Sequence, residues 1–437
     1  MRVGDGRRIL TSWAPKSRLD SRPDDIDYSD GPSIEPCRVL FFLPCIAHPK
    51  RKTRQIQTIS LNCFLMAFAS TSPQNNDIQI LRAVAITLVV LQHYWRLPEP
   101  ALLTSIRAHH ALWAGVDVFL AISGFLMCQA CLRYIDGPLS PLAALLTFAT
   151  HRARRLIPAL LGALLFSVVV AAALNSFNVH ATWLALRGAI VALLGVSNFY
   201  WHDCFNSAIN TCGSGDFNGV TWSLSLEWQL YAVLAIAMFF AGRRVAMGVL
   251  VLASIALSSF PPVMFSLPWV LRPGAFTLGC LVYLVYARRP TAVLRYPRWV
   301  CRIALIVGVL ICVGSTQWLP PHCAFLGMAA GAAIALCAAL RGDCFSGGWL
   351  GKLGLWIGAR SYSIYLFHLP VMVVVQSAIA RSGAAMSRYD VMIAATLCFA
   401  GVTALLSDRS YRFIEVRFNR KSPLSDQAGR MTSAEPT

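Results

Sequence analysis

The chain has 437 residues, of which 56% are hydrophobic and only 13% are charged, and 38 Lys and Arg residues face 20 Asp and Glu residues. Soluble chains carry about 25% charged residues, so this composition excludes a soluble globular protein, and it is too apolar for a disordered one. A net charge of +18 could indicate nucleic-acid binding, but nucleic-acid binders are not this apolar. The alternative is a polytopic membrane protein whose basic residues lie on the cytoplasmic side.

Residues 1–65 differ in kind from the rest of the chain. They carry 11 basic and 7 acidic residues, many prolines, and an apolar stretch from Val39 to Ile46 that is too short to span a membrane. Two interpretations stay open for this segment. It is either a disordered N-terminal extension, or it precedes a true translation start at Met66, a dozen residues before the first predicted span.

Ten apolar runs are long enough to cross a bilayer, for which an α-helix needs about 20 residues. They cover approximately residues 78–95, 115–132, 156–174, 221–240, 245–260, 268–287, 302–317, 322–340, 361–380 and 389–407. An eleventh, weaker run covers 183–200. The sequence therefore predicts an all-α polytopic membrane protein, with a transmembrane domain over 66–421 and a cytoplasmic tail over 422–437.

The distribution of Lys and Arg predicts the orientation. If the N-terminus is cytoplasmic and 183–200 does not cross, nineteen basic residues lie in inner loops and the tail, against five in outer loops. This bias would largely vanish if 183–200 crossed. We therefore expect ten spans with both termini inside and a re-entrant or interfacial segment at 183–200. Cys204 and Cys212 would then lie outside, where they form either a disulfide or two free thiols.

Ionisable groups inside spans are costly and are therefore candidates for function. Arg82 and His93 lie eleven residues apart, on one face of the first span and about 16 Å apart in depth. Taken alone, Arg82 could be an inner anchor and His93 an interfacial histidine. The predicted topology, however, places His93, Asp117 and Glu227 together in the outer half of the membrane. A histidine with carboxylate partners is a general acid–base arrangement, and a proton relay in a transporter is the alternative.

Two further polar patterns begin spans. Arg152 and Arg155 lie three residues apart and face one way, as a fork for phosphate would, although a plain topogenic cluster has the same spacing. Ser361, Tyr365 and His368 follow i, i+4, i+7 spacing. They form a polar stripe that either holds helices together or lines a polar cavity. Most of the fourteen cysteines lie in apolar runs without zinc-ligand spacing, so no metal is expected.

Taken in order, these segments resemble the motifs of the acyltransferase-3 family of bacterial integral membrane acyltransferases, over about residues 78–420. The matching pieces are the Arg82-to-His93 spacing, Gly115-Val116-Asp117-Val118-Phe119 with Ile122-Ser123-Gly124-Phe125, Arg152 to Arg155 before Pro158, Trp222-Ser223-Leu224-Ser225-Leu226-Glu227 with Tyr231, Ser361-Tyr362-Ser363-Ile364-Tyr365-Leu366 with His368, and Arg412-Phe413-Ile414-Glu415. The sequence departs from the family pattern at Trp228, where a second acid is usual.

The resemblance implies a ten-span enzyme of the bacterial inner membrane that takes an acyl group, usually acetyl, from cytoplasmic acyl-CoA. The acceptor would be a hydroxyl of a cell-surface glycan, a lipid-linked saccharide or a similar molecule. His93 would be the catalytic base, Glu227 its acid–base or orienting partner, and Arg82 with the Arg152–Arg155 pair would bind the donor.

From the residues themselves, Asp117 joins the catalytic group and the Ser361, Tyr365 and His368 stripe is assigned to substrate binding. No nucleic-acid partner is expected. Because the chain ends soon after Lys421, neither is an appended hydrolase-like domain. The alternative function is a proton-coupled transporter or exporter of a glycan intermediate.

Overall fold

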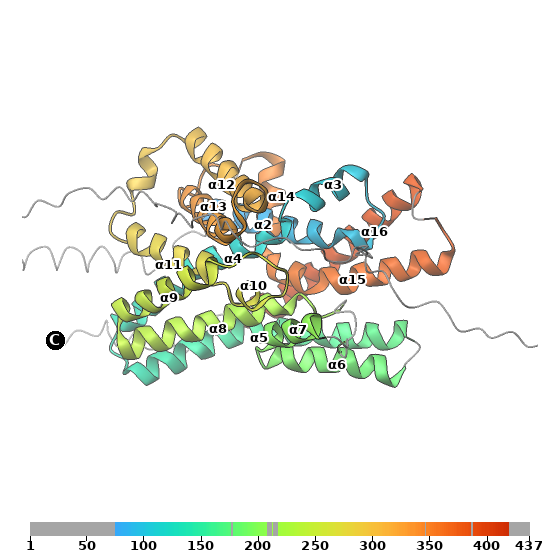
Figure 1. Ribbon diagram of the computed structural model, residues 1–437, viewed down its shortest axis with the longest axis horizontal. Helices are drawn as coiled ribbons and strands as arrows, with labels where there is room; N and C mark the ends of the chain where they lie inside the picture. The colour runs from blue at the N-terminus through green and yellow to red at the C-terminus, as the bar shows by residue number, and fades with distance from the viewer. Residues whose placement is uncertain are drawn as a thin grey trace, which may run out of the picture. The chain divides into compact units, whose positions relative to one another are not determined.

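The computed structural model describes residues 75–175, 178–207, 212, 217–345, 347–385 and 388–418. These residues belong to one compact unit that begins at Pro73. Every regular element in these ranges is helical (Figure 1). The predicted N-terminal extension, the alternative start at Met66 and the tail from 422 onward lie outside the described residues.

Nine helical segments in the described part of the chain are long and apolar enough to cross a membrane, and each overlaps a predicted run. The helices that build them are α2 (Asn76–His93), α4 (Gly115–Ile135), α5 (Pro141–Leu174), α8 (Thr221–Ile236) with the π-helical η3 (Ala237–Ala241), α10 (Leu267–Leu271) with α11 (Gly274–Tyr286), α12 (Arg298–Trp318), α13 (Ala324–Ala339), α15 (Ser361–Ser382), and α16 (Tyr389–Ser410) with the π-helical η6 (Tyr411–Glu415) and α17 (Val416–Phe418). The protein is thus an all-α, multi-pass membrane protein, as the sequence predicts.

The remaining described elements are shorter helices, of 16 residues or fewer. They are η1 (Tyr94–Arg96), α3 (Ala101–His109), η2 (Leu112–Ala114), α6 (Val179–Leu193), α7 (Ser197–Asn206), α9 (Arg243–Ser258), η4 (Ala292–Arg295), η5 (Pro321–Cys323) and α14 (Gly348–Ala359).

Local sequence explains where several spanning helices begin and end. Asn75 caps α2, its side chain accepting a hydrogen bond from the Ile78 amide at 3.0 Å. Ser140 caps α5 in the same way and is followed by Pro141, whose fixed φ suits the first helical position. At the other end, Gly383 terminates α15 in the left-handed region, with φ +68°.

One predicted run, 245–260, is not among the nine segments. It corresponds to α9, which has 16 residues and is about 24 Å long. It begins directly after η3, at the end of α8. The segment that follows it returns to the start of α8, because the ring of Phe265 lies 6.4 Å from that of Trp222 in the first turn. The chain from α9 to Phe265 therefore runs back along the whole of α8, which is the reversal that the predicted topology needs.

The weak run at 183–200 is broken into α6 and α7 at Gly195, where φ is +69°. The break lies beside the first half of α8, because the Gly195 carbonyl accepts from Gln229 at 2.8 Å and the Ser197 amide donates to Ser225 at 3.0 Å. The chain thus turns back well short of the end of α8 and η3. Beyond α7, Cys204 and Cys212 form a disulfide, which resolves the alternative left open by the sequence.

Glycines bring α4 and α11 into backbone contact. A Cβ atom added to Gly124 would lie 2.0 Å from the Phe276 carbonyl oxygen, and one added to Gly279 would lie 2.0 Å from that of Ala121. Small residues that allow such close approach are typical of helix packing in membranes. The contact fixes α4 as one rigid wall of the site described next.

Candidate active site

A pocket with an empty volume of about 950 Å³ lies among α2, α4, α5, α8, α15 and η6. Arg82, Arg152 and Arg155 line it, together with the carboxylates of Glu227 and Glu415. The three arginines assigned to donor binding are therefore brought together, although they come from two helices that are distant in the sequence. Glu227 shares their pocket.

None of these three arginines forms a hydrogen bond or an ion pair with another residue in the described ranges. The side chains are half-buried, and Nε of Arg152 is buried without any partner. A guanidinium carries five N–H donors, and each buried donor without an acceptor costs about 1–3 kcal/mol. Arg152 bears this cost at Nε, and three arginines without a protein partner in the described ranges line one cavity. This arrangement indicates that their acceptors belong to an anionic ligand.

The two carboxylates of the pocket are held by hydroxyl groups. Glu227 accepts hydrogen bonds from Ser123 on α4 and from Tyr231, one turn further along α8. The Tyr231 hydroxyl also lies 3.1 Å from Ser123 Oγ. Glu415 accepts from Ser363. Because each carboxylate is oriented by neighbouring hydroxyls, neither closes an ion pair with the arginines.

The predicted polar stripe on α15 divides between two environments. Ser361 and Tyr365 line the pocket, and Ser361 Oγ is buried without a hydrogen-bond partner. The Tyr365 hydroxyl is bonded to Ser223 Oγ at 2.6 Å and to the Val220 carbonyl at 2.7 Å. His368 is completely buried and points instead toward α2.

His93 lies at the end of α2 and does not line the pocket. Its Nδ1 atom is 2.9 Å from the Val89 carbonyl oxygen and 3.3 Å from Nε2 of His368. The ring centroids of His93 and His368 are 5.2 Å apart, and those of His368 and Tyr365 are 5.8 Å apart. Three successive rings therefore connect the wall of the arginine pocket with His93.

Asp117 has a different partner from the one expected. Its carboxylate is bound by Arg272 through Nε and Nη2, both at 3.0 Å, and the two side chains are only 3% and 2% exposed. The Arg272 guanidinium also donates to the Trp269 carbonyl at 2.6 Å. It is surrounded by the rings of Trp113, Trp222, Trp269 and Phe325, with centroids 4.9–5.6 Å away.

No hydrogen bond or ion pair joins His93, Asp117 and Glu227 to one another in the described residues. His93 pairs with His368, Asp117 pairs with Arg272 inside the aromatic cage, and Glu227 lines the arginine pocket. Sequence reasoning missed Arg272, although a single arginine inside an otherwise apolar run was a visible signal. It also left Ser123, Tyr231 and Glu415 without a role, although all three lie in the quoted motifs.

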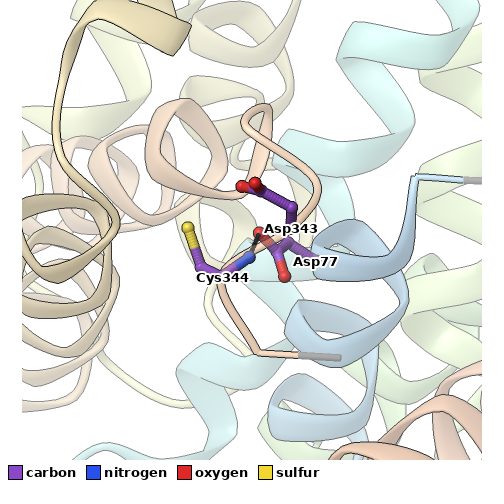
Figure 2. Close-up of side chains that lie close together, drawn as sticks. All are labelled: Asp77, Asp343 and Cys344. Atoms are coloured by element: carbon purple, nitrogen blue, oxygen red, sulfur yellow. Dashed lines mark hydrogen bonds between the residues drawn. The ribbon is translucent and has the colours of Figure 1, made fainter. Parts of the chain in front are cut away.

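One cluster in the described ranges has the composition of a metal site. Ligand atoms of Asp77, Asp343 and Cys344 all lie within 4.8 Å of one another (Figure 2). Both oxygens of Asp77, however, accept backbone hydrogen bonds, from Cys344 at 2.7 Å and Phe345 at 2.9 Å. Asp343 forms ion pairs with two arginines. These contacts identify the cluster as an anchor between α2 and the connection that follows α13.

Comparison with known proteins identifies relatives. A family model described as an acyltransferase domain, the acyltransferase-3 model, matches residues 75–407. YrhL of Bacillus subtilis (strain 168), provisionally named a peptidoglycan O-acetyltransferase, is 26% identical over 69% of this chain and 49% of its own length. The O-acetyltransferase OatA of Staphylococcus aureus (strain NCTC 8325 / PS 47) is 25% identical, over 70% of this chain and 52% of OatA.

A third relative is BcsY of Komagataeibacter xylinus, provisionally named a membrane-bound transacylase. It is 29% identical over 69% of this chain and 74% of its own length. The matches to YrhL and OatA thus span about half the length of those proteins. No solved structure matches the chain.

Proposed function

Because the chain belongs to the acyltransferase-3 family, we propose that it is an O-acyltransferase of the bacterial inner membrane. It transfers an acyl group, acetyl in the simplest case, from cytoplasmic acyl-CoA to a hydroxyl of a cell-surface glycan or lipid-linked saccharide. The names of YrhL and OatA support O-acetylation, and the name of YrhL supports a glycan acceptor.

One observation carries the proposal: Arg82, Arg152 and Arg155 face one pocket without partners in the described chain. CoA offers a pyrophosphate and a ribose phosphate, and arginine binds phosphate through paired N–H donors. In the predicted topology Arg82 lies toward the start of α2, in the cytoplasmic half of the membrane. A donor made in the cytoplasm would enter from that side.

His93 supplies the base in this proposal. Since its Nδ1 faces the Val89 carbonyl oxygen, which can only accept, the hydrogen of the neutral ring lies on Nδ1 and Nε2 keeps a lone pair. Nε2 takes the proton of the acceptor hydroxyl while the hydroxyl oxygen attacks the thioester carbonyl. The C–O ester bond forms, the C–S bond breaks, and the proton passes from His93 to the departing CoA thiolate.

The remaining pocket residues position the donor. Glu227, fixed by Ser123 and Tyr231, lines the same pocket as the arginines and Tyr365. The acyl end of the donor would have to pass the Tyr365 ring to approach His93. Asp117 has a structural role here, because Arg272 occupies both of its oxygens.

The test is a CoA-release assay on the purified full chain in proteoliposomes, with acetyl-CoA and a crude lipid-linked glycan fraction as acceptor. We expect acceptor-dependent CoA release that falls at least about 100-fold in His93→Gln, the lower bound for loss of a general base. The paired substitution Arg152→Gln with Arg155→Gln should raise the KM for acetyl-CoA. The matched control is Arg154→Gln, an exposed neighbour outside the pocket.

Two outcomes would overturn the proposal. One is wild-type activity in His93→Gln, and the other is an unchanged KM in the double arginine variant. Transport of a glycan without CoA consumption would favour the proton-coupled transporter. That alternative requires a relay through His93, Asp117 and Glu227, and the described structure contains no hydrogen bond among these three residues.

A further inference from the structure

The contact between His93 and His368 joins the end of α2 to the middle of α15, and α15 also packs against α16 (Figure 1). We propose that His368 is a positioning residue for His93: it fixes the proton of His93 on Nδ1, holds the ring in place, and stabilises the imidazolium that forms during acyl transfer. This inference rests on the proposed function of His93 as the base. It replaces the expectation that His368 binds substrate.

The hydrogen positions follow from the acceptors around each ring. Nδ1 of His368 is 2.8 Å from the Tyr365 carbonyl oxygen and 3.2 Å from that of Ile364. Carbonyl oxygens only accept, so Nδ1 of His368 carries the hydrogen of the neutral ring. Nε2 of His368 is then an acceptor, and the group that it faces is Nδ1 of His93 at 3.3 Å.

The same reasoning applied to His93 gives a shared hydrogen. Nδ1 of His93 donates to the Val89 carbonyl at 2.9 Å, and the Nε2 lone pair of His368 lies on the same N–H group. Two acceptors thus hold one hydrogen on Nδ1 and leave Nε2 of His93 free. The tautomer that a base requires is therefore set by the surroundings, before any substrate arrives.

The burial of His368 favours a positioning role over a role in substrate binding. His368 is 0% exposed and does not line the arginine pocket, and both of its ring nitrogens have partners among the described residues. No atom of its ring is left to recognise an acceptor. His93, in contrast, is only partly buried, and the recorded contacts of its ring with the described residues all involve Nδ1.

The arrangement also stabilises the product of proton transfer. When Nε2 of His93 takes the hydroxyl proton, the positive charge spreads over a ring whose Nδ1–H points at two acceptors. In serine hydrolases a carboxylate performs this task. A neutral imidazole does it without placing a second formal charge in the apolar interior, where an unpaired charge is expensive.

The experiment compares His368→Leu with His368→Gln in the proteoliposome assay. Leucine removes the acceptor, so we expect kcat to fall about 100-fold, comparable to a modest general-base contribution, while the KM values for acetyl-CoA and acceptor change less than about threefold. The side-chain oxygen of glutamine can accept at the Nε2 position, so His368→Gln should recover at least about tenfold of that loss.

The matched control is His202→Leu. The Nδ1 atom of His202 also faces a backbone carbonyl, that of Phe265 at 2.6 Å, and its second contact in the described residues is with the Asn206 side chain at 3.2 Å instead of a histidine. Its substitution should leave kcat unchanged. Nitrogen-15 spectra of histidine-labelled protein add a readout of the tautomer. His93 should be the Nδ1–H form in the wild type. In His368→Leu the Val89 carbonyl is the one acceptor left at Nδ1 among the described contacts, so the preference weakens and the Nε2–H form should become detectable.

The following results would contradict the positioning role of His368. Equal losses in the leucine and glutamine variants would reduce His368 to a packing residue. A raised acceptor KM with unchanged kcat would return it to substrate binding, and a wild-type His93 spectrum in His368→Leu would also overturn the proposal. If the wild type releases no CoA, the proposed function fails, while the spectra still report whether His368 sets the His93 tautomer.

Discussion

Two groups of buried arginines in this protein show how the same side chain takes opposite roles. Arg272 sits among four aromatic rings, donates to both oxygens of Asp117 and to a backbone carbonyl, and is almost completely shielded. Arg82, Arg152 and Arg155 have no such partners in the described chain and face a cavity. The number of satisfied donors, more than burial or charge, separates an arginine that holds the fold from one that awaits a ligand.

The energetic reasoning behind the comparison is direct. A buried ion pair is tolerated only when its geometry is good and its remaining donors are bonded, and it becomes destabilising when one partner is removed. Among the pocket arginines, Arg152 already bears the cost of a buried, unbonded donor at Nε. Binding an anion relieves that cost, so these residues contribute to ligand affinity and not to the stability of the free protein.

The largest effect on stability is expected at the Asp117–Arg272 ion pair, which is surrounded by aromatic rings. Asp117→Ala leaves Arg272 charged and buried, and should lower the free energy of unfolding by about 3–5 kcal/mol. Thermal unfolding of the detergent-solubilised protein measures it. The control is Asp390→Ala, which breaks an ion pair with Arg388 whose side chains are 64% and 65% exposed. A loss no larger than that of the control would remove the distinction between the two groups.

In the presence of the donor, the pocket arginines should contribute to the stability of the protein. CoA at 100 times its Kd is expected to stabilise the wild type by about 2.7 kcal/mol through mass action. The double variant Arg152→Gln with Arg155→Gln should lose this gain while its ligand-free melting temperature stays unchanged or rises. Melting curves with and without CoA measure both quantities. A double variant that is destabilised without CoA and still stabilised by it would assign these arginines to the fold.

A smaller effect is expected from Arg82→Lys. Lysine keeps the positive charge but loses the planar pair of donors that matches phosphate. We expect the Kd for CoA to rise about tenfold, which corresponds to about 1.4 kcal/mol. Equilibrium binding of labelled CoA measures the change, and Arg154→Lys is the control. An unchanged Kd would mean that Arg82 acts only as a point charge or does not touch the donor.

The smallest effect is expected at an exposed ion pair. Burial raises the pKa of Asp343, but the hydrogen bonds and charges of Arg298 and Arg341 outweigh it and hold the pKa below its usual value. The contribution to stability is therefore present at neutral pH and lost as the pH falls through the lowered pKa. Asp343→Asn should cost only about 0–1 kcal/mol at pH 7. The difference from wild type should shrink in unfolding measurements as the pH is lowered below 3.8 and through the lowered pKa.

The sequence carries more information about the depth of a residue in the membrane than about which helices pack side by side. The apolar runs predict where the chain can cross the membrane, and nine of the ten predicted runs overlap helices long and apolar enough to do so in the described residues. The orientation predicted from the basic loops stays a prediction. Depth alone does not say which helices are adjacent. The predicted topology places His93 and Asp117 both toward the outer side, yet His93 meets His368 on α15 and Asp117 meets Arg272. Lateral packing decides such pairs, and it depends on contacts between distant segments.

The arginine pocket was easier to anticipate for a chemical reason. Arg152 and Arg155 stand one turn apart on a single helix, so their common direction follows from helix geometry. Only the resemblance to known acyltransferases connected them with Arg82. Arg272 was overlooked because it lies inside a run that is otherwise apolar, where hydropathy averages over a single charge.

The glycine contacts between α4 and α11 set a limit for redesign. A pocket is usually widened by trimming side chains or by moving a helix outward. Here Gly124 and Gly279 leave no gap between the two backbones, so α4 has no room to shift toward α11 and no larger residue fits at either position. An engineer seeking a longer acyl donor should shorten Leu156, which lines the pocket from α5, and leave the α4 side untouched.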